Sequence, residues 1–287
     1  MAAPEFGPRR LIRRHSDGKD QFDQAMGAVR ASPELVALGQ DGRGEGRFTS
    51  RAMIEVEQRL MQGAERLADR ESHSLPTATL NDAIIAARSN GLVLGGEQKA
   101  ALDHITAPSD LAIVTGYAGT GKSAMLSVAR DAWSRAGYEV QGLALSGIAA
   151  ENLESGSGIA SRTIASIEHQ WGQGRDLLTD NHILVIDEAG MIGSRQMERV
   201  ISEAEKRGAK VVLVGDPEQL QAIEAGAAFR SIAERHGSVE ITEVRRQRED
   251  WATQVEPVFG AAALMTFRSA PWPLIQPQEF GEEDGWS

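Results

Sequence analysis

One stretch of the chain has the residue types and spacing that phosphate binding requires. Residues 116–123 read Gly-Tyr-Ala-Gly-Thr-Gly-Lys-Ser, a G-x-x-x-x-G-K-S pattern that comes after the apolar run LAIVT and precedes a helical pattern. Glycines leave backbone N–H groups free to face a phosphate, and the next helix N-terminus adds its positive dipole end. Lys122 then reaches the β- and γ-phosphate oxygens, and the Ser123 hydroxyl is a ligand for Mg²⁺. The candidate nucleotide-binding residues are Gly116, Gly119, Thr120, Gly121, Lys122 and Ser123.

A pair of acidic residues comes after a second apolar run. The sequence His-Ile-Leu-Val-Ile delivers Asp187 and Glu188 to the carboxyl end of a buried strand. At such a position Asp187 can hold Mg²⁺ through water, and Glu188 can position and deprotonate an attacking water molecule. A solvated strand end with no function is the alternative, and the phosphate-binding pattern upstream favours the catalytic interpretation.

A third apolar run, Lys-Val-Val-Leu-Val, leads into Gly215-Asp216-Pro217-Glu218-Gln219. Gly-Asp-Pro alone indicates only a turn. The position of Gln219 after a strand makes its neutral amide a candidate sensor of the γ-phosphate, because an amide donates to oxygen without carrying charge.

Short apolar runs alternate with helix-length segments through the middle of the chain, at residues 111–115, 139–145, 183–186, 211–214 and 239–244. This alternation is typical of βαβ units, and it predicts an α/β fold with a parallel sheet flanked by helices. Upstream we expect two small helices in residues 21–41, the second opened by Ser32-Pro33, and a long helix capped by Thr49 or Ser50 that runs to Arg70. Shorter helices are expected at residues 80–88, 97–105 and 124–135.

These patterns divide the chain into four parts. We expect a flexible segment at residues 1–20, a helical region at 21–96, the α/β domain at 97–250, and a poorly ordered tail at 251–287. The tail contains four of the ten prolines, which exclude a long regular helix there.

Composition excludes several classes of protein. The 287 residues are 41% hydrophobic, so a sizeable core is possible, and the net charge of −11 argues against nonspecific adhesion to nucleic acid. The absence of cysteine excludes disulfides and thiolate chemistry. No apolar run is long enough to span a membrane, and the N-terminus lacks the apolar region of a secretory signal. We expect a cytoplasmic protein with no membrane partner.

Five segments in a fixed order carry a family resemblance: GYAGTGKS, LSGIAAENLESGSGIASRTIAS, VIDEAGMIGSRQM, VLVGDPEQLQAIEAGAAFRSIAERH and ITEVRRQRED. Together they resemble the RecD-like superfamily-1 helicase segment of TraA-type conjugative relaxases, over residues 21–250. The resemblance implies a RecA-like P-loop NTPase fold, hydrolysis of ATP with Mg²⁺, and movement along single-stranded DNA. It also implies other conjugative-transfer proteins as partners.

The resemblance assigns roles to individual residues. Gln98 in GGEQKAAL matches the family's adenine-recognising glutamine, and Lys122, Ser123, Asp187, Glu188 and Gln219 match positions already singled out. Arg246 in TEVRRQ matches the arginine that stabilises transferred phosphate charge, although the adjacent Arg245 could hold that role instead. Gly147, Ala149 and Thr163 lie in segments that resemble the family's strand-binding motifs, and ordinary helix and loop residues are the alternative.

The chain departs from the family in two ways. Its only tyrosines, Tyr117 and Tyr138, lie inside the motor segment, and its six histidines are scattered, so we expect no nicking activity. Nothing after Trp251 resembles a second RecA-like domain, which suggests truncation or a shifted reading frame. Three functions stay open: a helicase-type ATPase, an ATP-binding remnant with little turnover, and a P-loop ATPase that does not act on nucleic acid.

Overall fold

The computed structural model describes residues 14–40, 42, 44, 46–117, 119–216 and 227–243. The chain divides into two compact units, Met1–Val244 and Arg245–Ser287, and all of the described residues belong to the first. The domain boundaries expected after residues 20, 96 and 250 stay predictions. The expected tail at residues 251–287 lies outside the described residues.

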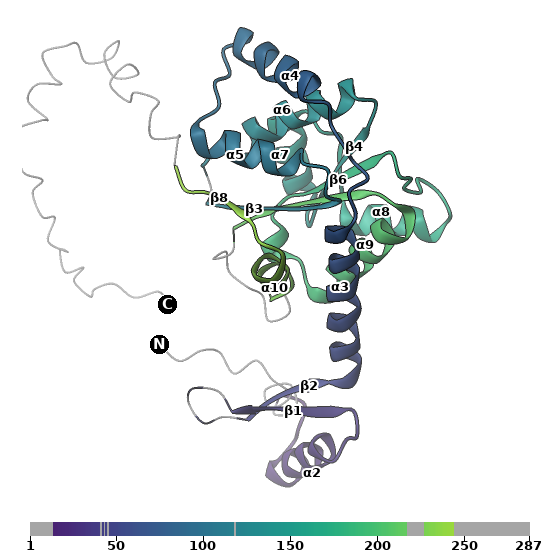
Figure 1. Ribbon diagram of the computed structural model, residues 1–287. Coiled ribbons are helices and arrows are strands. Elements are labelled where there is room, and N and C mark those ends of the chain that lie inside the picture. The colour runs from purple at the N-terminus through teal and green to yellow at the C-terminus, as the bar shows by residue number, and fades with distance from the viewer. Residues whose placement is uncertain are drawn as a thin grey trace, which may run out of the picture. The chain divides into compact units, whose positions relative to one another are not determined.

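A parallel sheet of six strands forms the centre of the first unit (Figure 1). The strands lie in the order β5-β4-β6-β7-β3-β8, and every neighbouring pair is parallel. Their bounds are Leu111–Gly116 (β3), Glu139–Ala144 (β4), Ser161–Thr163 (β5), His182–Ile186 (β6), Lys210–Gly215 (β7) and Val239–Ile241 (β8). In a parallel sheet the carboxyl ends of all strands meet at one edge, so this order places the predicted chemistry at that edge.

Helices lie on both sides of the sheet. Their bounds are Arg51–Asp69 (α3), Thr77–Ser89 (α4), Gly96–Ile105 (α5), Lys122–Arg135 (α6), Gly147–Ser157 (α7), Ile164–Gly172 (α8), Ser194–Arg207 (α9) and Ala227–His236 (α10), with a short 3-10 helix, η1, at Ala189–Met191. Within the part of the chain that the structure describes, no helix is long and apolar enough to cross a membrane.

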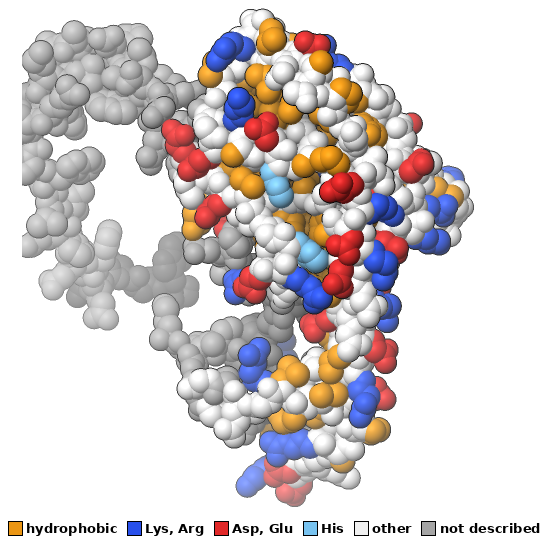
Figure 2. Space-filling view, viewed as in Figure 1, with side chains coloured by type: hydrophobic (Ala, Val, Ile, Leu, Met, Phe, Trp, Pro, Cys, Tyr) orange, Lys and Arg blue, Asp and Glu red, His pale blue; other side chains and the backbone are white. Residues whose placement is uncertain are grey.

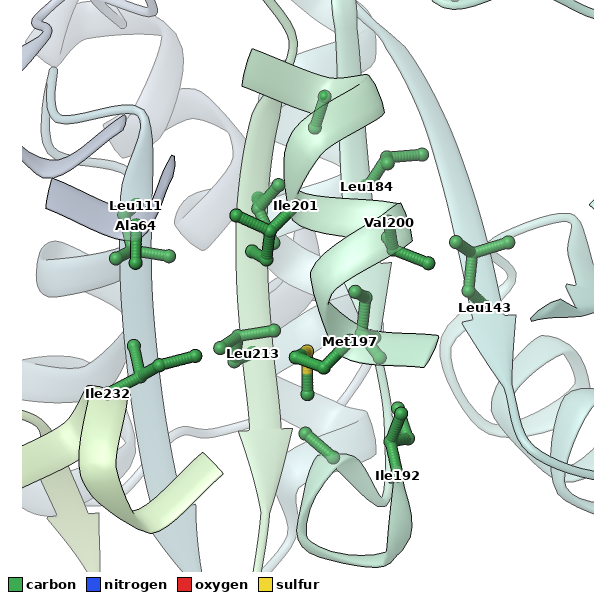
Figure 3. Close-up of a cluster of buried hydrophobic side chains, with 14 of the residues drawn as sticks. Ala64, Leu111, Leu143, Leu184, Ile192, Met197, Val200, Ile201, Leu213 and Ile232 are labelled. Atoms are coloured by element: carbon green, nitrogen blue, oxygen red, sulfur yellow. The ribbon is translucent and has the colours of Figure 1, made fainter. Parts of the chain in front are cut away.

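Alternate residues of each central strand pack against different helices. On β7, Leu213 contributes to a buried cluster with α3, α8, α9 and α10, whereas Val212 contributes to a second cluster with α4, α5, α6 and α7. Figure 3 shows the first cluster, in which Met197, Val200 and Ile201 of α9 lie over the strands. Strands buried on both faces read as continuous apolar runs, and the prediction of a parallel sheet flanked by helices is confirmed.

Helix α3 belongs to this core although it precedes the sheet by more than forty residues. Its residues Leu60, Ala64 and Leu67 are buried in the first cluster. Gly63 allows the approach to α9, because a Cβ at this position would lie 3.0 Å from the Ile201 methyl group. The expected long helix is confirmed, and the Ser50 hydroxyl caps it by accepting from the Met53 N–H at 3.1 Å.

The expectation of two helices in residues 21–41 is half wrong. Helix α2 (Lys19–Arg30) is present, but the second segment forms strand β1 (Leu35–Gln40), which pairs antiparallel with β2 (Gly46–Ser50). The segment between Pro33 and Gly39 is too short to nucleate a stable helix. Gly39 also has a φ of +95° at the register shift, a conformation that ends helices and suits a bulge.

The other expected elements are present with small shifts. Helix α6 begins two residues before the expected start, and β8 ends at Ile241, so it is three residues shorter than the apolar run suggested. Strand β5 was not anticipated, because Ser161-Arg162-Thr163 contains no apolar residue. It forms by pairing with β4 at the sheet edge.

A buried charged network closes the opposite edge of the sheet, where the strands begin. Asp110 is fully buried before β3 and accepts hydrogen bonds from Arg70, from the Ser72 N–H (3.1 Å) and from His73 Nδ1 (2.6 Å). Burial opposes ionisation of Asp110, but the hydrogen bonds from His73 and Arg70 outweigh it and hold its pKa below the usual value. Lys210 is also fully buried, and its Nζ donates to the Ala107 carbonyl at 2.5 Å.

The buried Lys210 makes stability depend on pH. Burial lowers its pKa to about 8, against attraction to Asp110. Below pH 8 Lys210 is charged in both folded and unfolded chains, and the folded state carries the full desolvation cost. Between pH 8 and about 10.5 only the folded chain loses the proton, so the contribution to the free energy of unfolding should rise, by up to about 3 kcal/mol.

We expect this rise to be missing in Lys210→Met. Urea unfolding of both proteins at pH 7.5 and pH 10 measures it, as a difference in unfolding free energy that moves in favour of the wild type at the higher pH. If the free energy of unfolding changes with pH equally in the two proteins, Lys210 does not lose its proton in the folded chain between these pH values.

Candidate nucleotide-binding site

The loop between β3 and α6 is shaped by its glycines. Gly119 and Gly121 have φ values of +86° and +81°, in the left-handed region that other residues rarely adopt. A Cβ at Gly116 would lie 2.8 Å from the Ile241 carbonyl oxygen, so only glycine lets β8 pass this closely. Thr120 is fully buried, and its hydroxyl donates to the Tyr117 carbonyl at 2.9 Å. These four residues together hold the curved backbone that the sequence predicts for phosphate binding.

Lys122 is the first residue of α6, and its ammonium group lies against the loop. Its Nζ donates to the carbonyl oxygens of Gly116 at 2.7 Å and Tyr117 at 2.9 Å. Burial lowers the Lys122 pKa, while attraction to Asp187, Asp216 and Glu188 raises it. The lysine therefore lies within electrostatic reach of carboxylates from the ends of two other strands.

Asp187 and Glu188 come directly after β6. The Asp187 N–H donates to the Leu143 carbonyl of β4 at 3.0 Å, and an oxygen of Asp187 accepts from the Glu188 N–H at 2.9 Å. Burial raises the pKa of both carboxyl groups, and the Asp187 charge raises that of Glu188 further. Glu188 has a φ of +53°, which few residues with a side chain adopt; among the described residues the exposed Asp176, with a φ of +49°, shares it.

Two glycines bring the ends of β6 and β7 together. A Cβ at Gly190 would lie 2.5 Å from the Asp216 carbonyl oxygen, and one at Gly215 would lie 2.9 Å from the Gly190 nitrogen. The close approach explains why Asp216 joins Asp187 and Glu188 around Lys122. The sequence analysis assigned Asp216 no role. The only sequence feature that could have indicated one is the Gly-Asp-Pro turn that follows an apolar run.

Ser123 packs against helix α7. A Cβ at Gly156 would lie 3.0 Å from Ser123 Cβ and 3.1 Å from its hydroxyl oxygen. Hydroxyl and carboxylate oxygens are the ligands that Mg²⁺ prefers, so Ser123 and Asp187 fit this ion. Among the described residues no cluster of three or more His, Asp or Glu side chains could hold a metal alone.

Gln98 connects helix α5 to the phosphate-binding loop. Its amide nitrogen donates to the carbonyl oxygens of Thr120 at 3.0 Å and Gly121 at 3.2 Å, and its oxygen accepts from the Gly95 N–H at 2.9 Å. Both amide hydrogens are therefore engaged by the loop, and only the oxygen has capacity for a further partner. The predicted contact with adenine stays a prediction, beside a structural role that sequence reasoning missed.

The residues of the motifs predicted to bind a DNA strand lie at the carboxyl edge of the sheet, where the phosphate-binding loop also lies. Gly147 begins α7 after β4, and Thr163 caps α8 after β5, its hydroxyl accepting from the Ser166 N–H at 3.2 Å. Ala149 is buried. The large apolar side chains exposed to solvent here are those of Leu145 (41% exposed) and Ile148 (73% exposed). Two of the three predicted positions thus have structural roles, and their predicted contacts with DNA stay predictions.

Two predicted site residues, Gln219 and Arg246, lie outside the described residues. The described part of the chain stops at Asp216 before Gln219 and ends at Glu243 before Arg246. Their predicted roles at the γ-phosphate stay predictions.

A family model described as AAA domain matches residues 93–258, which is more than half of the chain. The chain belongs to this AAA domain family. The match begins just before α5 and includes the phosphate-binding loop and both acidic strand ends, so the residues brought together above are those of the family domain.

Two curated relatives show which proteins of the family the chain is similar to. The conjugal transfer protein TraA of Agrobacterium fabrum is 44% identical over 249 residues, which cover 84% of this chain and 22% of TraA. The ATP-dependent RecD2 DNA helicase of Deinococcus radiodurans is 30% identical over 267 residues, covering 86% of this chain and 35% of the helicase. The resemblance to TraA-type and RecD-like proteins is confirmed, and the chain spans about a fifth of the TraA length.

One solved structure similar to the chain is the crystal structure of the Pif1 helicase from Candida albicans. It is 25% identical with a TM-score of 0.40, and the match covers 56% of this chain and 42% of that chain. The parallel sheet, the loop and the family membership together make the unit a RecA-like motor domain related to TraA and RecD helicases.

The contact between Gly156 and Ser123 yields a prediction. Gly156→Ala should push the Ser123 hydroxyl from its place, although alanine suits the interior of α7 better than glycine. We expect Mg²⁺-dependent ATP affinity to fall about tenfold, the effect of one lost ligand or hydrogen bond. Titration with a fluorescent ATP analogue, with and without Mg²⁺, measures this effect.

Gly172→Ala is the matched control, because a Cβ at this helical glycine meets nothing within 4 Å. Unchanged Mg²⁺-dependent affinity in Gly156→Ala, at unchanged thermal stability, would show that Ser123 is not a ligand of the ion.

Proposed function

We propose that this chain binds Mg²⁺·ATP in the β3–α6 loop and hydrolyses it as the motor domain of a DNA helicase from a conjugative-transfer protein. One observation carries the proposal: Lys122 begins α6 directly after a loop shaped by glycines, and Asp187 and Glu188 follow β6 at the same edge of the parallel sheet. Phosphoryl transfer to water requires a cation that faces the phosphates, a carboxylate that binds the metal ion, and a second carboxylate that acts as a base. The similarity to TraA and RecD2 supports the same assignment.

The residues divide the reaction between them. Backbone N–H groups from Gly119 to Ser123 and the N-terminus of α6 bind the phosphates, and the Lys122 ammonium offsets the charge that develops on them. Glu188 takes the proton of the attacking water, and its raised pKa makes it a stronger base than an ordinary glutamate. Mg²⁺, held by Ser123 and Asp187, supplies further charge neutralisation at the phosphates.

Three further residues complete the proposed site. Gln98 recognises adenine through its free acceptor capacity, Gln219 senses the γ-phosphate, and Arg246 or its neighbour Arg245 stabilises charge on the transferred phosphate. Support for these roles comes from the family resemblance and, for Gln98, from its place beside the loop.

Substitution of Lys122 and Glu188 tests the proposal. Lys122→Ala should weaken ATP binding by about 10- to 100-fold, because a charge-assisted contact with phosphate is lost. Glu188→Gln should bind ATP normally but lower turnover by about 10²- to 10⁴-fold, the contribution of a general base. Steady-state phosphate release and nucleotide titration, with and without single-stranded oligonucleotide, measure both.

The outcomes separate the remaining functions. Turnover lost in both variants supports an ATPase, whereas binding without turnover in the wild type supports an ATP-binding domain with little activity. Wild-type turnover in both variants would overturn the proposed mechanism.

The DNA partner rests on weaker support than the nucleotide. The net charge is −11, and on the face shown in Figure 2 the Lys and Arg side chains are interspersed with Asp and Glu rather than gathered in one patch. Contacts to single-stranded DNA would then depend on the strand-end edge, where Leu145 and Ile148 are exposed and can pack against bases. A partnership with other conjugative-transfer proteins rests on the similarity to TraA alone.

Binding of DNA should be weak and should decline as salt rises, because release of counterions drives it. Ile148→Glu should weaken it several-fold or more, since an apolar contact is lost and a repulsive charge is added. Fluorescence anisotropy of a labelled single-stranded oligonucleotide at 50 and 200 mM salt measures both effects.

Ile85→Glu is the control, because Ile85 is 62% exposed but lies on α4 rather than at a strand end. Absence of binding at low salt would favour a P-loop ATPase that does not act on nucleic acid.

A further inference from the structure

Glu97, in the first turn of α5, accepts three hydrogen bonds from the residues that follow β8. One carboxylate oxygen accepts from the N–H groups of Thr242 at 2.7 Å and Glu243 at 2.9 Å, and the other accepts from the Thr242 hydroxyl at 2.8 Å. These bonds, that from the Glu243 N–H most of all, hold the Glu97 pKa below its usual value. The carboxylate is therefore ionised at neutral pH, and its bonds to residues 242 and 243 are charge-assisted.

Strand β8 is a short strand at one edge of the sheet. It comprises the three residues Val239–Ile241 and pairs only with β3 among the described strands. Such strands open more readily than central strands, because fewer backbone hydrogen bonds and buried contacts oppose their opening. Ile241 is fully buried and anchors the strand in the second cluster, and Glu97 binds the two residues that come directly after it.

The end of β8 lies against the first residue of the phosphate-binding loop. Ile241 is in register with Gly116, and a Cβ at Gly116 would lie 2.8 Å from the Ile241 carbonyl oxygen and 3.2 Å from the Thr120 hydroxyl oxygen. Gly116 is therefore close to both the strand and a buried threonine of the loop. Its own carbonyl oxygen accepts from the Lys122 ammonium group at 2.7 Å. A shift of β8 away from β3 would remove the contact that confines this glycine.

The next side chain of α5 binds the loop directly. Gln98 donates to the carbonyl oxygens of Thr120 at 3.0 Å and Gly121 at 3.2 Å. Consecutive residues of one helical turn thus contact the loop in two ways, Gln98 through the Thr120 and Gly121 carbonyls and Glu97 through the end of β8.

We propose that Glu97 is a positioning residue for the phosphate-binding loop, and that it acts by holding the end of β8 against Gly116. This inference rests on the proposed function, because the loop is the proposed site of nucleotide binding. Glu97 is only half-buried, whereas the fully buried Ile241 anchors β8 in the core. Loss of the carboxylate should therefore loosen the loop more than it lowers the stability of the fold.

Amide hydrogen exchange of the full 287-residue chain, without nucleotide, tests whether Glu97 holds the loop. Glu97→Ala should speed exchange about three- to tenfold in peptides that contain β8. It should do the same in peptides that contain the Thr120 N–H, which donates to the Tyr117 carbonyl at 3.4 Å. Peptides from α9, which packs in the first cluster, should exchange as in the wild type. Faster exchange in β8 alone, or throughout the chain, would overturn the proposal.

Equilibrium binding measures the consequence for the proposed site. The probes are fluorescent derivatives of ATPγS and ADP with Mg²⁺. Glu97→Ala should weaken binding of both about three- to tenfold, because the loop binds phosphates that the two nucleotides share. Wild-type affinity for both probes would contradict the positioning role. A loss confined to the triphosphate would also contradict it, because the effect would then lie at the γ-phosphate rather than in the loop.

Glu97→Gln should restore both the slow exchange and the affinities. The amide oxygen can accept from both backbone N–H groups, and the amide nitrogen can donate to the Thr242 hydroxyl. Asp103→Ala is the matched control, because Asp103 is an exposed carboxylate of the same helix whose side chain has no partner among the described residues. It should leave exchange and affinity unchanged, and an effect equal to that of Glu97→Ala would count against a specific role of Glu97.

The wild type and Lys122→Ala distinguish this inference from the proposed function. If the wild type binds both probes and Lys122→Ala weakens both, the results for Glu97→Ala decide the positioning role alone. If the wild type binds neither probe, the proposed function fails and the inference fails with it.

Discussion

The candidate site depends on one ammonium group that lies within electrostatic reach of three carboxylates at a single edge of the sheet. Lys122 is the first residue of α6, which follows β3; Asp187 and Glu188 follow β6, and Asp216 follows β7. Three negative charges around one positive charge would repel a bare triphosphate. A divalent cation bound with a nucleotide would remove that repulsion.

Sequence periodicity was sufficient for the sheet because its central strands are buried on both faces. Residues 211–214 of β7 have no polar side chain, a pattern typical of a parallel sheet between two helical layers. The same reasoning failed at Leu35–Gln40, where local apolar residues suggested a helix. The deciding contribution there is pairing with Gly46–Ser50, and the sequence of the first strand alone does not contain it.

The candidate site divides in the same manner. The loop glycines, Lys122 and the Asp187-Glu188 pair are local in sequence, so their spacing identified them. Asp216 could not be identified in this way, because its place at the site arises from a backbone approach between the ends of β6 and β7. Gln98 was identified by resemblance, but its bonds to Thr120 and Gly121 depend on a contact across more than twenty residues.

The two edges of the sheet have opposite physical demands. At the carboxyl edge Glu188 is held at a φ of +53° and its charge is partly desolvated, both of which cost stability. At the other edge the fully buried Asp110 accepts hydrogen bonds from Arg70 and from the buried His73. The same strands connect both edges, so the buried groups at their start, among which His73 Nε2 has no hydrogen-bond partner in the described part of the chain and Lys210 is desolvated, lie away from the candidate site. Stability and chemistry are thereby assigned to different ends of β3, β6 and β7, and substitutions at the strand starts should alter folding before they alter the site.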